Sequence, residues 1–367
     1  LHLCDRRQRQ MCIRDRSSVA PIADMGATVE QMCVYIEALD SGCVRFSATD
    51  MNNSVRHTKS ALIKEVGTCL VSARKLQALV KTLPSQAVEI KTDGQEVKIS
   101  CGKIKANIPS LDPSLFDPLV FVDTSCGIEM PFDEFSDIVK SCVKNVATKD
   151  DRPAITCVHI HAVDNRLIFT ATDSFKVYEG FANCAKPVEF DALVPAVFLS
   201  KVAALKAGKT IKFAIDHNQI AFSDGEIEIG SSLNMGKYPN LKVALSYNAY
   251  LNVVVSTAAL RRAVERANSV RSHTVRLEAQ QGVLKITGIS KDDGTTYEEI
   301  ECECSNPEYQ KAYLNSSYLQ QYIGSLLFNK ITLSFCGENR PLGISSDYSN
   351  GIVMPVRAPE GLSLIHI

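Results

Sequence analysis

The sequence predicts an α+β protein made of three similar domains in tandem, and three observations lead to that prediction. A pair of alternating strands that ends in a polar corner recurs about every 120 residues. Each pair is followed by a short amphipathic segment and then by a second pair of alternating strands. The length of 367 residues suits several domains better than one core, and 45% hydrophobic residues can fill those cores.

The first strand pair of each domain carries the clearest repeat. The pairs cover residues 32–36 with 44–50, residues 157–161 with 167–173, and residues 275–278 with 284–290. Their corners read Ala48-Thr49-Asp50 and Ala171-Thr172-Asp173, and Ser290 stands at the third equivalent position. Alternation with a period of two is typical of half-buried antiparallel strands.

Helices are predicted next by their start signals and their apolar faces. Ser72, Pro195 and Asn315 begin short helices over 72–83, 195–205 and 315–326. Further helices start at Phe132 and Ser256, at the opening of the second and third domains, where apolar residues recur with helical spacing. Period-two hairpins follow the short helices over residues 88–99, 211–222 and 331–344.

These elements place the domains at residues 17–125, 126–247 and 248–358, with the first domain lacking its opening strand and helix. Residues 1–16 and 359–367 show no helix or strand period, and they look like translated adapter sequence. A native basic arm is the alternative interpretation of residues 1–16.

Charge and cysteine content narrow the function classes. Forty Lys and Arg against 41 Asp and Glu give a net charge of −1, which excludes a uniform polycation but leaves a local basic face open. Thirteen cysteines without any CxxC pair are typical of free thiols in a reducing compartment, so we expect a cytoplasmic protein. No apolar run is long enough to span a membrane.

An enzymatic interpretation finds little support. Asp50 and Asp173 could serve a metal-dependent hydrolase together with His159 and His161, which share one strand face. The third corner carries Ser290 instead of an acid, however, and Thr-Asp corners commonly bind local backbone at a strand end. We therefore expect an exposed strand face at the histidines, no metal and no cofactor, and the hydrolase stays as an alternative.

Several motifs together resemble one family, the bacterial DNA polymerase III beta subunit, which is the replicative sliding clamp. The matching stretches lie between Ser17 and Arg357 and include Ile108-Pro109-Ser110-Leu111-Asp112, Asp151-Arg152-Pro153, Tyr238-Pro239-Asn240 and Val353-Met354-Pro355-Val356-Arg357. Each motif is short, but their order, spacing and threefold repetition are specific.

The resemblance implies the DNA-clamp fold, with two helices per domain packed on antiparallel sheets, and a non-catalytic function. It implies a ring-shaped homodimer that encircles duplex DNA and makes the replicative polymerase processive. The implied protein partners are the polymerase alpha subunit, the clamp loader and other proteins with a clamp-binding motif. A peptide-binding scaffold that forms no ring is the alternative.

The resemblance also assigns roles to basic and edge residues. Basic residues on equivalent helices, or just after them, are expected to contact DNA phosphates. Without the family, a solvated helix face would be the favoured explanation of their pattern. This set comprises Arg74, Lys140, Lys144, Lys149, Arg152, Lys201, Arg262 and Arg266. The dimer interface is expected at Ala106 and Ile108 of one copy and at Val270 to His273 of the next.

A groove for partner peptides rich in Gln, Leu and Phe is implied between the second and third domains. Its expected residues are Ile155, Thr172, Ser174, Phe175, Lys176, Val177, Pro239, Leu241, Val243, Ile352, Val353, Met354, Pro355, Val356 and Arg357. Apolar residues tipped by Lys176 and Arg357 would form an apolar site with few polar anchors. Ser174-Phe175-Lys176 replaces the Gly-His-Arg that is usual in the family, so Phe175 should add an aromatic wall.

Overall fold

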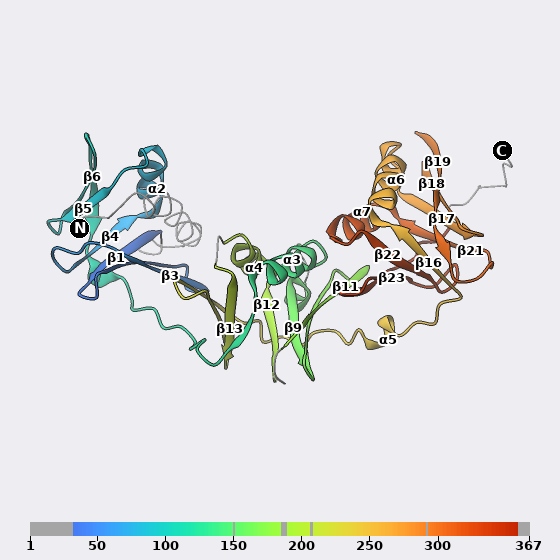
Figure 1. Cartoon of the computed structure of the whole chain (residues 1–367), viewed down its shortest axis with the longest axis horizontal. Coiled ribbons are helices and arrows are strands. Elements are labelled where there is room, and N and C mark those ends of the chain that lie inside the picture. Colours follow the sequence, from blue (N-terminus) through green and yellow to red (C-terminus); the bar gives the residue numbers. More distant parts are fainter. Residues whose placement is uncertain (1–31, 150, 185–188, 206–207, 291–292, 359–367) are drawn as a thin grey trace. The chain divides into compact units, whose positions relative to one another are not determined.

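The computed structural model describes residues 32–149, 151–184, 189–205, 208–290 and 293–358 (Figure 1). The segments 1–16 and 359–367, which we expect to be foreign, lie outside the described residues. The chain divides into two compact units, Leu1–Phe132 with Ala204–Leu233 and Asp133–Ala203 with Asn234–Ile367. Each unit is described separately.

The first unit is built on one eleven-stranded antiparallel sheet with the order β5-β6-β7-β4-β1-β2-β3-β15-β14-β13-β8. Its strands are β1 (Cys33–Leu39), β2 (Cys43–Thr49), β3 (Asn53–Ser60), β4 (Gly67–Ser72), β5 (Val88–Thr92), β6 (Glu96–Cys101), β7 (Ile104–Leu111), β8 (Ile128–Pro131), β13 (Thr210–Asp216), β14 (Gln219–Ser223) and β15 (Ile227–Ser232). Helix α2 (Ala73–Thr82) follows β4, and the short helix η1 (Pro113–Leu115) follows β7.

The second unit contains a nine-stranded sheet, β12-β9-β10-β11-β24-β23-β22-β16-β20, and a four-stranded sheet, β19-β18-β17-β21. The nine strands are β9 (Cys157–Val163), β10 (Arg166–Thr172), β11 (Lys176–Asn183), β12 (Asp191–Pro195), β16 (Leu251–Ser256), β20 (Glu303–Cys304), β22 (Lys330–Phe335), β23 (Leu342–Ser345) and β24 (Ser349–Val353). The four are β17 (Thr274–Gln280), β18 (Val283–Ser290), β19 (Gly294–Glu301) and β21 (Gln310–Asn315).

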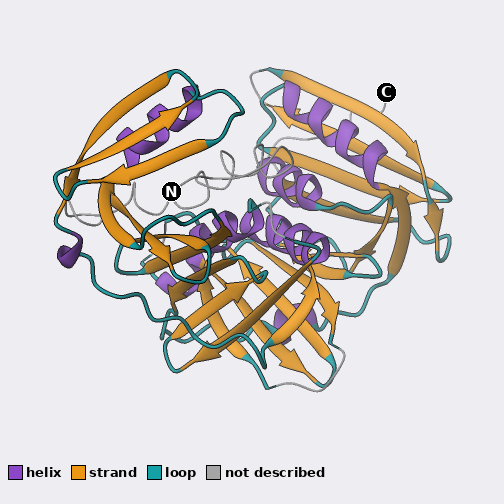
Figure 2. Ribbon diagram, turned by 60° about the vertical axis from the view of Figure 1, so that its left-hand side comes forward, coloured by secondary structure: helices purple, strands orange, loops and turns teal. Residues whose placement is uncertain are grey.

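Helices cover the sheets of the second unit (Figure 2). They are α3 (Phe132–Val143), η2 (Pro153–Thr156), α4 (Ala196–Ala203), α5 (Lys242–Leu245), α6 (Thr257–Ser269) and α7 (Ser316–Ser325). Helices α6 and α7 pack against each other, and α6 also packs on β18 and β19 (Figure 1). The predicted antiparallel α+β architecture is therefore confirmed.

Local sequence signals explain where the helices begin. The Ser256 hydroxyl accepts from the Ala259 N–H at the start of α6, and the Asn315 side chain accepts from two N–H groups at the start of α7. Leu319, Tyr322 and Ile323 of α7 are buried, as their spacing on one helix face requires.

A third strand follows each of the hairpins at residues 88–99, 211–222 and 331–344. The resemblance implied an edge strand through residues 105–108 and a C-terminal strand at 352–353, whereas β15 was not predicted. Strands β7, β15 and β24 continue the hairpins β5–β6, β13–β14 and β22–β23. Strand β15 pairs with β3, and β24 pairs with β11 in the same antiparallel sense. These two pairings join the sheet of one repeat to the sheet of the next, so each is a junction between repeats.

Among the described residues, no helix is both long and apolar enough to cross a membrane. The same residues contain no group of three or more His, Cys, Asp or Glu side chains that could hold a metal ion.

Candidate functional site

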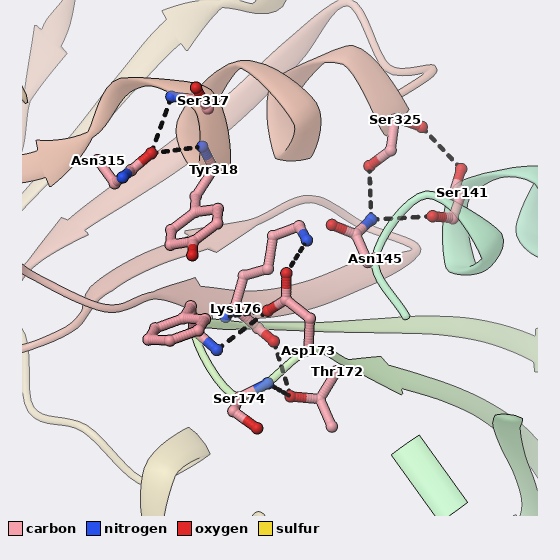
Figure 3. Close-up of polar contacts among 11 residues, drawn as sticks. Ser141, Asn145, Thr172, Asp173, Ser174, Lys176, Asn315, Ser317, Tyr318 and Ser325 are labelled. Atoms are coloured by element: carbon pink, nitrogen blue, oxygen red, sulfur yellow. Dashed lines mark hydrogen bonds and ion pairs between the residues drawn. The ribbon is translucent and has the colours of Figure 1, made fainter. Parts of the chain in front are cut away.

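The corner between β10 and β11 is held by its own side chains (Figure 3). The Thr172 hydroxyl donates to the Lys176 carbonyl over 2.8 Å and accepts from the Ser174 N–H. The Asp173 carboxylate accepts from the N–H groups of Phe175 and Lys176, both at 3.0 Å. Ser174 adopts a φ of +78°, which the tight turn demands. The expectation that the Thr-Asp pair binds local backbone is confirmed.

Lys176 does not lie at the rim of a groove, where the sequence placed it. Its side chain is only 2% exposed, and its ammonium group forms an ion pair with the Asp173 carboxylate (Figure 3). The ammonium also lies 5.8 Å from the centre of the Tyr318 ring, within the range of a cation–π contact. Lys176 thus supports the corner from beneath, and it needs Asp173 to offset its buried charge.

Phe175 is the exposed tip of this corner. Its side chain is 51% exposed, and its ring stacks on Tyr318 with 5.0 Å between centroids and 15° between planes. Tyr318 lies in the first turn of α7, where the Asn315 side chain accepts from its N–H (Figure 3). Sequence reasoning missed Tyr318. The sequence signal that could have indicated Tyr318 is its position as an aromatic residue three positions after Asn315, where the predicted helix of the third domain begins.

The chain's last described segment lies beside the same corner. The Met354 N–H donates to the Phe175 carbonyl over 2.9 Å, and the Val356 N–H donates to the Tyr313 carbonyl over 2.8 Å. Met354 itself is 39% exposed. The structure therefore brings together the two distant stretches that the sequence assigned to one site.

The fifteen expected groove residues separate by exposure. Ile155, Thr172, Lys176, Val177, Ile352 and Val353 are buried. Leu241, Pro355 and Val356 are half-buried, and Ser174, Phe175, Pro239, Val243, Met354 and Arg357 are exposed. Helix α5, which carries Val243, contacts β24. The accessible part of the site thus consists of the Phe175–Tyr318 stack, Met354 and the residues around them.

A buried polar network joins α3 to the end of α7 (Figure 3). The Ser141 hydroxyl donates to the Ser325 carbonyl over 2.7 Å, and the Asn145 amide donates to the Ser325 hydroxyl over 3.0 Å. The Lys144 ammonium donates to the Gly324 carbonyl over 3.1 Å. These bonds satisfy carbonyls at the end of a helix, where cations and donors are favoured. Lys144, expected to contact DNA, is therefore engaged within the protein.

The other residues expected to contact DNA have different surroundings. Lys140, Lys149 and Arg262 are exposed. Arg266 forms a bidentate ion pair with Glu298, and this pair lowers the pKa of the Glu298 carboxyl. The Arg152 guanidinium donates to the Ser174 hydroxyl over 2.8 Å, which places it at the β10–β11 corner. Of the remaining two, Arg74 of α2 is exposed and Lys201 of α4 is half-buried.

Strands β7 and β19 each have an edge that is largely unpaired among the described strands. The equivalent edges are paired in the junctions β3–β15 and β11–β24. Strand β19 ends the order of its sheet, and none of the described strands lies beyond it. Strand β7 contacts β4 only at its end, through Leu111 and Ser110. Ala106 on this strand is half-buried, whereas Ile108 is 5% exposed and packs into its own domain.

The strand face with the two histidines is not exposed as expected, and that prediction is wrong. His159 stacks on His161 at 4.6 Å between ring centroids and lies 4.9 Å from the ring of Tyr238. Its Nε2 atom lies 3.0 Å from Asp191 Oδ1. Burial lowers the pKa of His161. The pair therefore packs beneath the Tyr238 segment.

Asp50 repeats the role of Asp173 at the first corner. Its Oδ1 atom accepts from the N–H groups of Asn52 and Asn53. Both carboxylates are thus occupied by their own turns, which removes the basis for the hydrolase alternative.

Three family models match successive parts of the chain. Residues 31–119 match the N-terminal domain of the DNA polymerase III beta subunit, residues 129–240 its central domain and residues 244–357 its C-terminal domain. The matches follow the same order as the three repeats.

Full-length relatives and solved structures agree with these matches. The beta sliding clamp of Bacillus subtilis is 24% identical over 345 residues, which cover 88% of this chain and 91% of the relative. That of Streptomyces coelicolor is 26% identical over 338 residues, covering 87% and 89%. The crystal structure of the Bacillus subtilis clamp superposes with a TM-score of 0.88 at 22% identity, covering 98% of this chain and 99% of that chain. The Pseudomonas aeruginosa beta subunit gives 0.88 at 19% identity, covering 98% and 100%.

The fold and the matches define the class of protein as a DNA sliding clamp, a non-catalytic processivity subunit of replication. Within that class, the chain belongs to the DNA polymerase III beta subunit family. DNA and a polymerase are the partners that this family implies.

Proposed function

We propose that two copies of this clamp pair head to tail into a ring around duplex DNA, through β7 of one copy and β19 of the next. The ring tethers the replicative polymerase alpha subunit, and the clamp loader and other clamp-binding proteins use the same peptide site. The described cysteines are free thiols, which supports a reducing compartment and hence the cytoplasm.

The repeated junction carries this proposal. Strand β3 pairs with β15, and β11 pairs with β24, each joining one repeat to the next. Strand β19 holds the place of β3 and β11 in the third repeat, and β7 holds the place of β15 and β24 in the first. Among the described strands, β19 has no partner on one side and β7 pairs with β4 only at Ser110 and Leu111, and unpaired edges favour association with another strand. A head-to-tail contact that closes after two copies would pair both of these edges in each copy.

The two existing junctions also predict the register of the third. Ile229 of β15 lies opposite Val55 of β3. Strand β7 aligns with β15 through the equivalent hairpins, and β19 aligns with β3 through the equivalent corners. Ala106 therefore corresponds to Ile229 and Thr296 corresponds to Val55. We accordingly place Ala106 opposite Thr296 of a second copy.

Charge supports the same pairing. In this register Lys105 faces Tyr297, and Lys103 lies near Glu299 on the same face of the sheet. Lys103, Lys105, Tyr297 and Glu299 are exposed in the single chain. The opposite charges of Lys103 and Glu299 would stabilise the pairing by roughly 0.2–1 kcal/mol, although Glu299 already lies 3.4 Å from the Lys285 ammonium in the single chain.

A hollow lies beside β19, where the proposed register would put the end of β7. A cavity of about 620 Å³ is lined by residues that include Arg271, His273 and Asp293, the last of which directly precedes β19. In the proposed register Ile108 lies opposite Gly294, so the end of β7 reaches this hollow.

Sedimentation equilibrium tests the ring. The native chain should have the mass of a dimer, and a Lys103→Glu, Lys105→Glu variant should shift toward monomer, most strongly at low salt. Adding Glu299→Lys to that variant should restore the dimer. A monomeric native chain, or a dimer indifferent to both changes, would contradict the proposal.

DNA contact is proposed to be indifferent to sequence and to use exposed cations. Lys140, Lys149 and Arg262 are the first choice in the second unit. All three are exposed, and the one ion pair among them, between Lys140 and Asp137 at 4.0 Å, is looser than the bidentate pair of Arg266 with Glu298. Each lost phosphate contact should reduce the slope of log affinity against log salt by about 0.9. Alanine at all three should flatten the slope, whereas Arg266→Ala, which removes a cation already paired with Glu298, should change it less. A preference among duplexes of different sequence would argue against this mode.

A further inference from the structure

Cys302 and Cys304 occupy a corner of the third repeat where the chain passes from one sheet to another. Strand β19 pairs with β18 up to Glu301, and the Cys302 N–H still donates to the Gly282 carbonyl over 2.9 Å. Cys304 already pairs with Val253 of β16 in the nine-stranded sheet. The two cysteines therefore flank the point at which the backbone changes sheets.

The two thiols face each other across this corner. Their Sγ atoms lie 3.8 Å apart, and both residues are half-buried, so reagents can reach them. Glu303 between them points elsewhere, since its carboxylate lies 2.9 Å from the Lys330 ammonium. Residues two apart on an extended chain share a face, which brings the sulfur atoms together without any movement of distant segments.

We propose that Cys302 and Cys304 form a reversible dithiol–disulfide pair that a peroxide can oxidise. The proposal concerns a modification site within one copy, and it stands whether or not the ring interface is correct. The disulfide would tie the end of β19 to the start of β20 and so fix the corner between the two sheets.

The chemistry balances with a peroxide as oxidant. The sulfur of one cysteine attacks a peroxide oxygen, the O–O bond breaks, and a sulfenic acid and one water form. The second sulfur then attacks the sulfenic sulfur, the S–O bond breaks, and the disulfide forms with release of a second water. The two thiols supply two electrons and two protons, and a dithiol reductant returns both.

The surroundings predict how the oxidation depends on pH. Burial, together with the neighbouring Cys304, raises the pKa of Cys302 to about 12. A protonated thiol is a poor nucleophile, and Cys302 acts as the nucleophile in one of the two steps whichever thiol reacts first. Oxidation to the disulfide should therefore accelerate as the pH rises.

Other cysteines serve as comparisons. Cys126 is exposed, and its Sγ atom accepts a hydrogen bond from the Ser125 hydroxyl at 3.8 Å. Cys142 is fully buried, and burial raises the pKa of its thiol well above the usual range. Cys126 should therefore oxidise or alkylate without forming an internal disulfide, and Cys142 should stay inert in the folded chain.

Peptide mass spectrometry of the full chain tests the proposal. Trypsin should release residues 292–311 as one peptide whose only cysteines are Cys302 and Cys304. After treatment with hydrogen peroxide and then iodoacetamide, most of this peptide should have lost two hydrogens and carry no alkyl group. Treatment with dithiothreitol before alkylation should return it to the doubly alkylated form.

Single-cysteine variants supply the matched control. Cys302→Ser and Cys304→Ser should each abolish the loss of two hydrogens and leave a sulfenic or higher acid on the remaining sulfur. A trivalent arsenical, phenylarsine oxide, should bind the reduced native chain at this peptide and bind neither variant there. Double alkylation after peroxide, or sulfinic acid without disulfide, would overturn the proposal.

Discussion

The junctions between repeats share one backbone construction but differ in side chains. At the first, the Ser232 N–H donates to the Asn52 carbonyl over 2.9 Å, and at the second the Met354 N–H donates to the Phe175 carbonyl over 2.9 Å. Met51 and Ser174 adopt nearly the same left-handed φ, +75° and +78°. The corner is thus a device of the fold that recurs wherever one repeat meets the next.

The side chains show what the second junction adds. Asn52 and Asn53 of the first corner correspond to Phe175 and Lys176 of the second. At the first corner, the neutral Asn53 amide donates to the Asp50 carboxylate. At the second, the buried Lys176 ammonium forms an ion pair with the Asp173 carboxylate. Only the second corner presents an aromatic ring, stacked on Tyr318. The second corner therefore carries side chains beyond those that the turn itself needs.

The same substitution at the two corners should have unequal costs, and this is the largest effect we expect. Asp173→Ala leaves the Lys176 ammonium buried without its carboxylate, which should lower the free energy of unfolding by about 3–5 kcal/mol. Asp50→Ala loses turn hydrogen bonds alone and should cost about 1 kcal/mol. Denaturant unfolding monitored by circular dichroism measures both.

A second substitution identifies the cause. Adding Lys176→Met to Asp173→Ala removes the unpaired charge and should recover most of the lost stability. Equal costs at Asp50 and Asp173, or no recovery, would show that the buried ion pair does not distinguish the corners.

A glycine marks the second difference between the junctions. Gly351 lies opposite Tyr178 in the β11–β24 pairing, and an added Cβ would lie 2.1 Å from the Val177 carbonyl oxygen and 2.2 Å from the Tyr322 hydroxyl. Gly351→Ala should therefore destabilise the chain by about 3 kcal/mol. Gly324→Ala is the control, because nothing lies within 4 Å of its added Cβ. Thermal unfolding that ranks Gly324→Ala as the more harmful change would refute this packing account.

Peptide binding should distinguish the corners next. Phe175→Ala removes the exposed ring and Met354→Ala the side chain beside it, and each should weaken a fluorescent clamp-binding peptide roughly tenfold, about 1.4 kcal/mol. Asn52→Ala at the first corner should leave the affinity unchanged. Fluorescence anisotropy titration provides the measurement. Equal affinities of the native chain and the three variants would show that the peptide does not bind at the second corner.

The glutamates paired across the two junctions should contribute differently to stability as the pH changes, and this effect is smaller. Glu179 lies opposite Asn350 at the second junction, and burial raises the pKa of its carboxyl. The folded chain then holds this proton more tightly than the unfolded chain, so stability is lost as the pH rises from about 4.3 through the folded pKa. Glu179→Gln should remove that loss and raise stability at neutral pH by up to about 1 kcal/mol.

The first junction supplies the control for this pH effect. Glu228 lies opposite Arg56 and forms an ion pair with it at 3.2 Å. Glu228→Gln should slightly lower stability at neutral pH, by about 0–1 kcal/mol. Unfolding curves at pH 4 and pH 7, in which both variants shift in the same direction, would contradict the assignment.

Local signals predicted most of the fold, and contacts between distant residues explain the rest. Ser256 and Asn315 cap helices through bonds that depend on neighbouring residues, so their helices could be located from the sequence. Strand β15 was missed because much of its stability comes from pairing with the distant strand β3, and β7 and β24 were expected only through the family resemblance. Lys176 was placed at a rim because lysine is ordinarily exposed, whereas Asp173 and Tyr318 together bury it.

The candidate site was predicted in part for the same reason. The Phe175 corner and the Met354 segment could be recognised as motifs, and the structure brings them together. Tyr318 could not be found that way, since its place beside Phe175 depends on how α7 packs in the next repeat. The roles of the cations likewise depend on neighbours such as Glu298 and the Gly324 carbonyl, which no local pattern reveals.

Cross-linking tests most directly the central claim that a third junction, made between copies, repeats the two within the chain. A chain with Ala106→Cys and Thr296→Cys should form a covalent dimer under mild oxidation, because directly opposite Cβ atoms approach within disulfide range. A chain with Ala106→Cys and Thr295→Cys, in which the second thiol lies on the other face of the sheet, should cross-link no more than the native chain. Equal cross-linking of both variants, or none above the native background, would contradict the repeated junction.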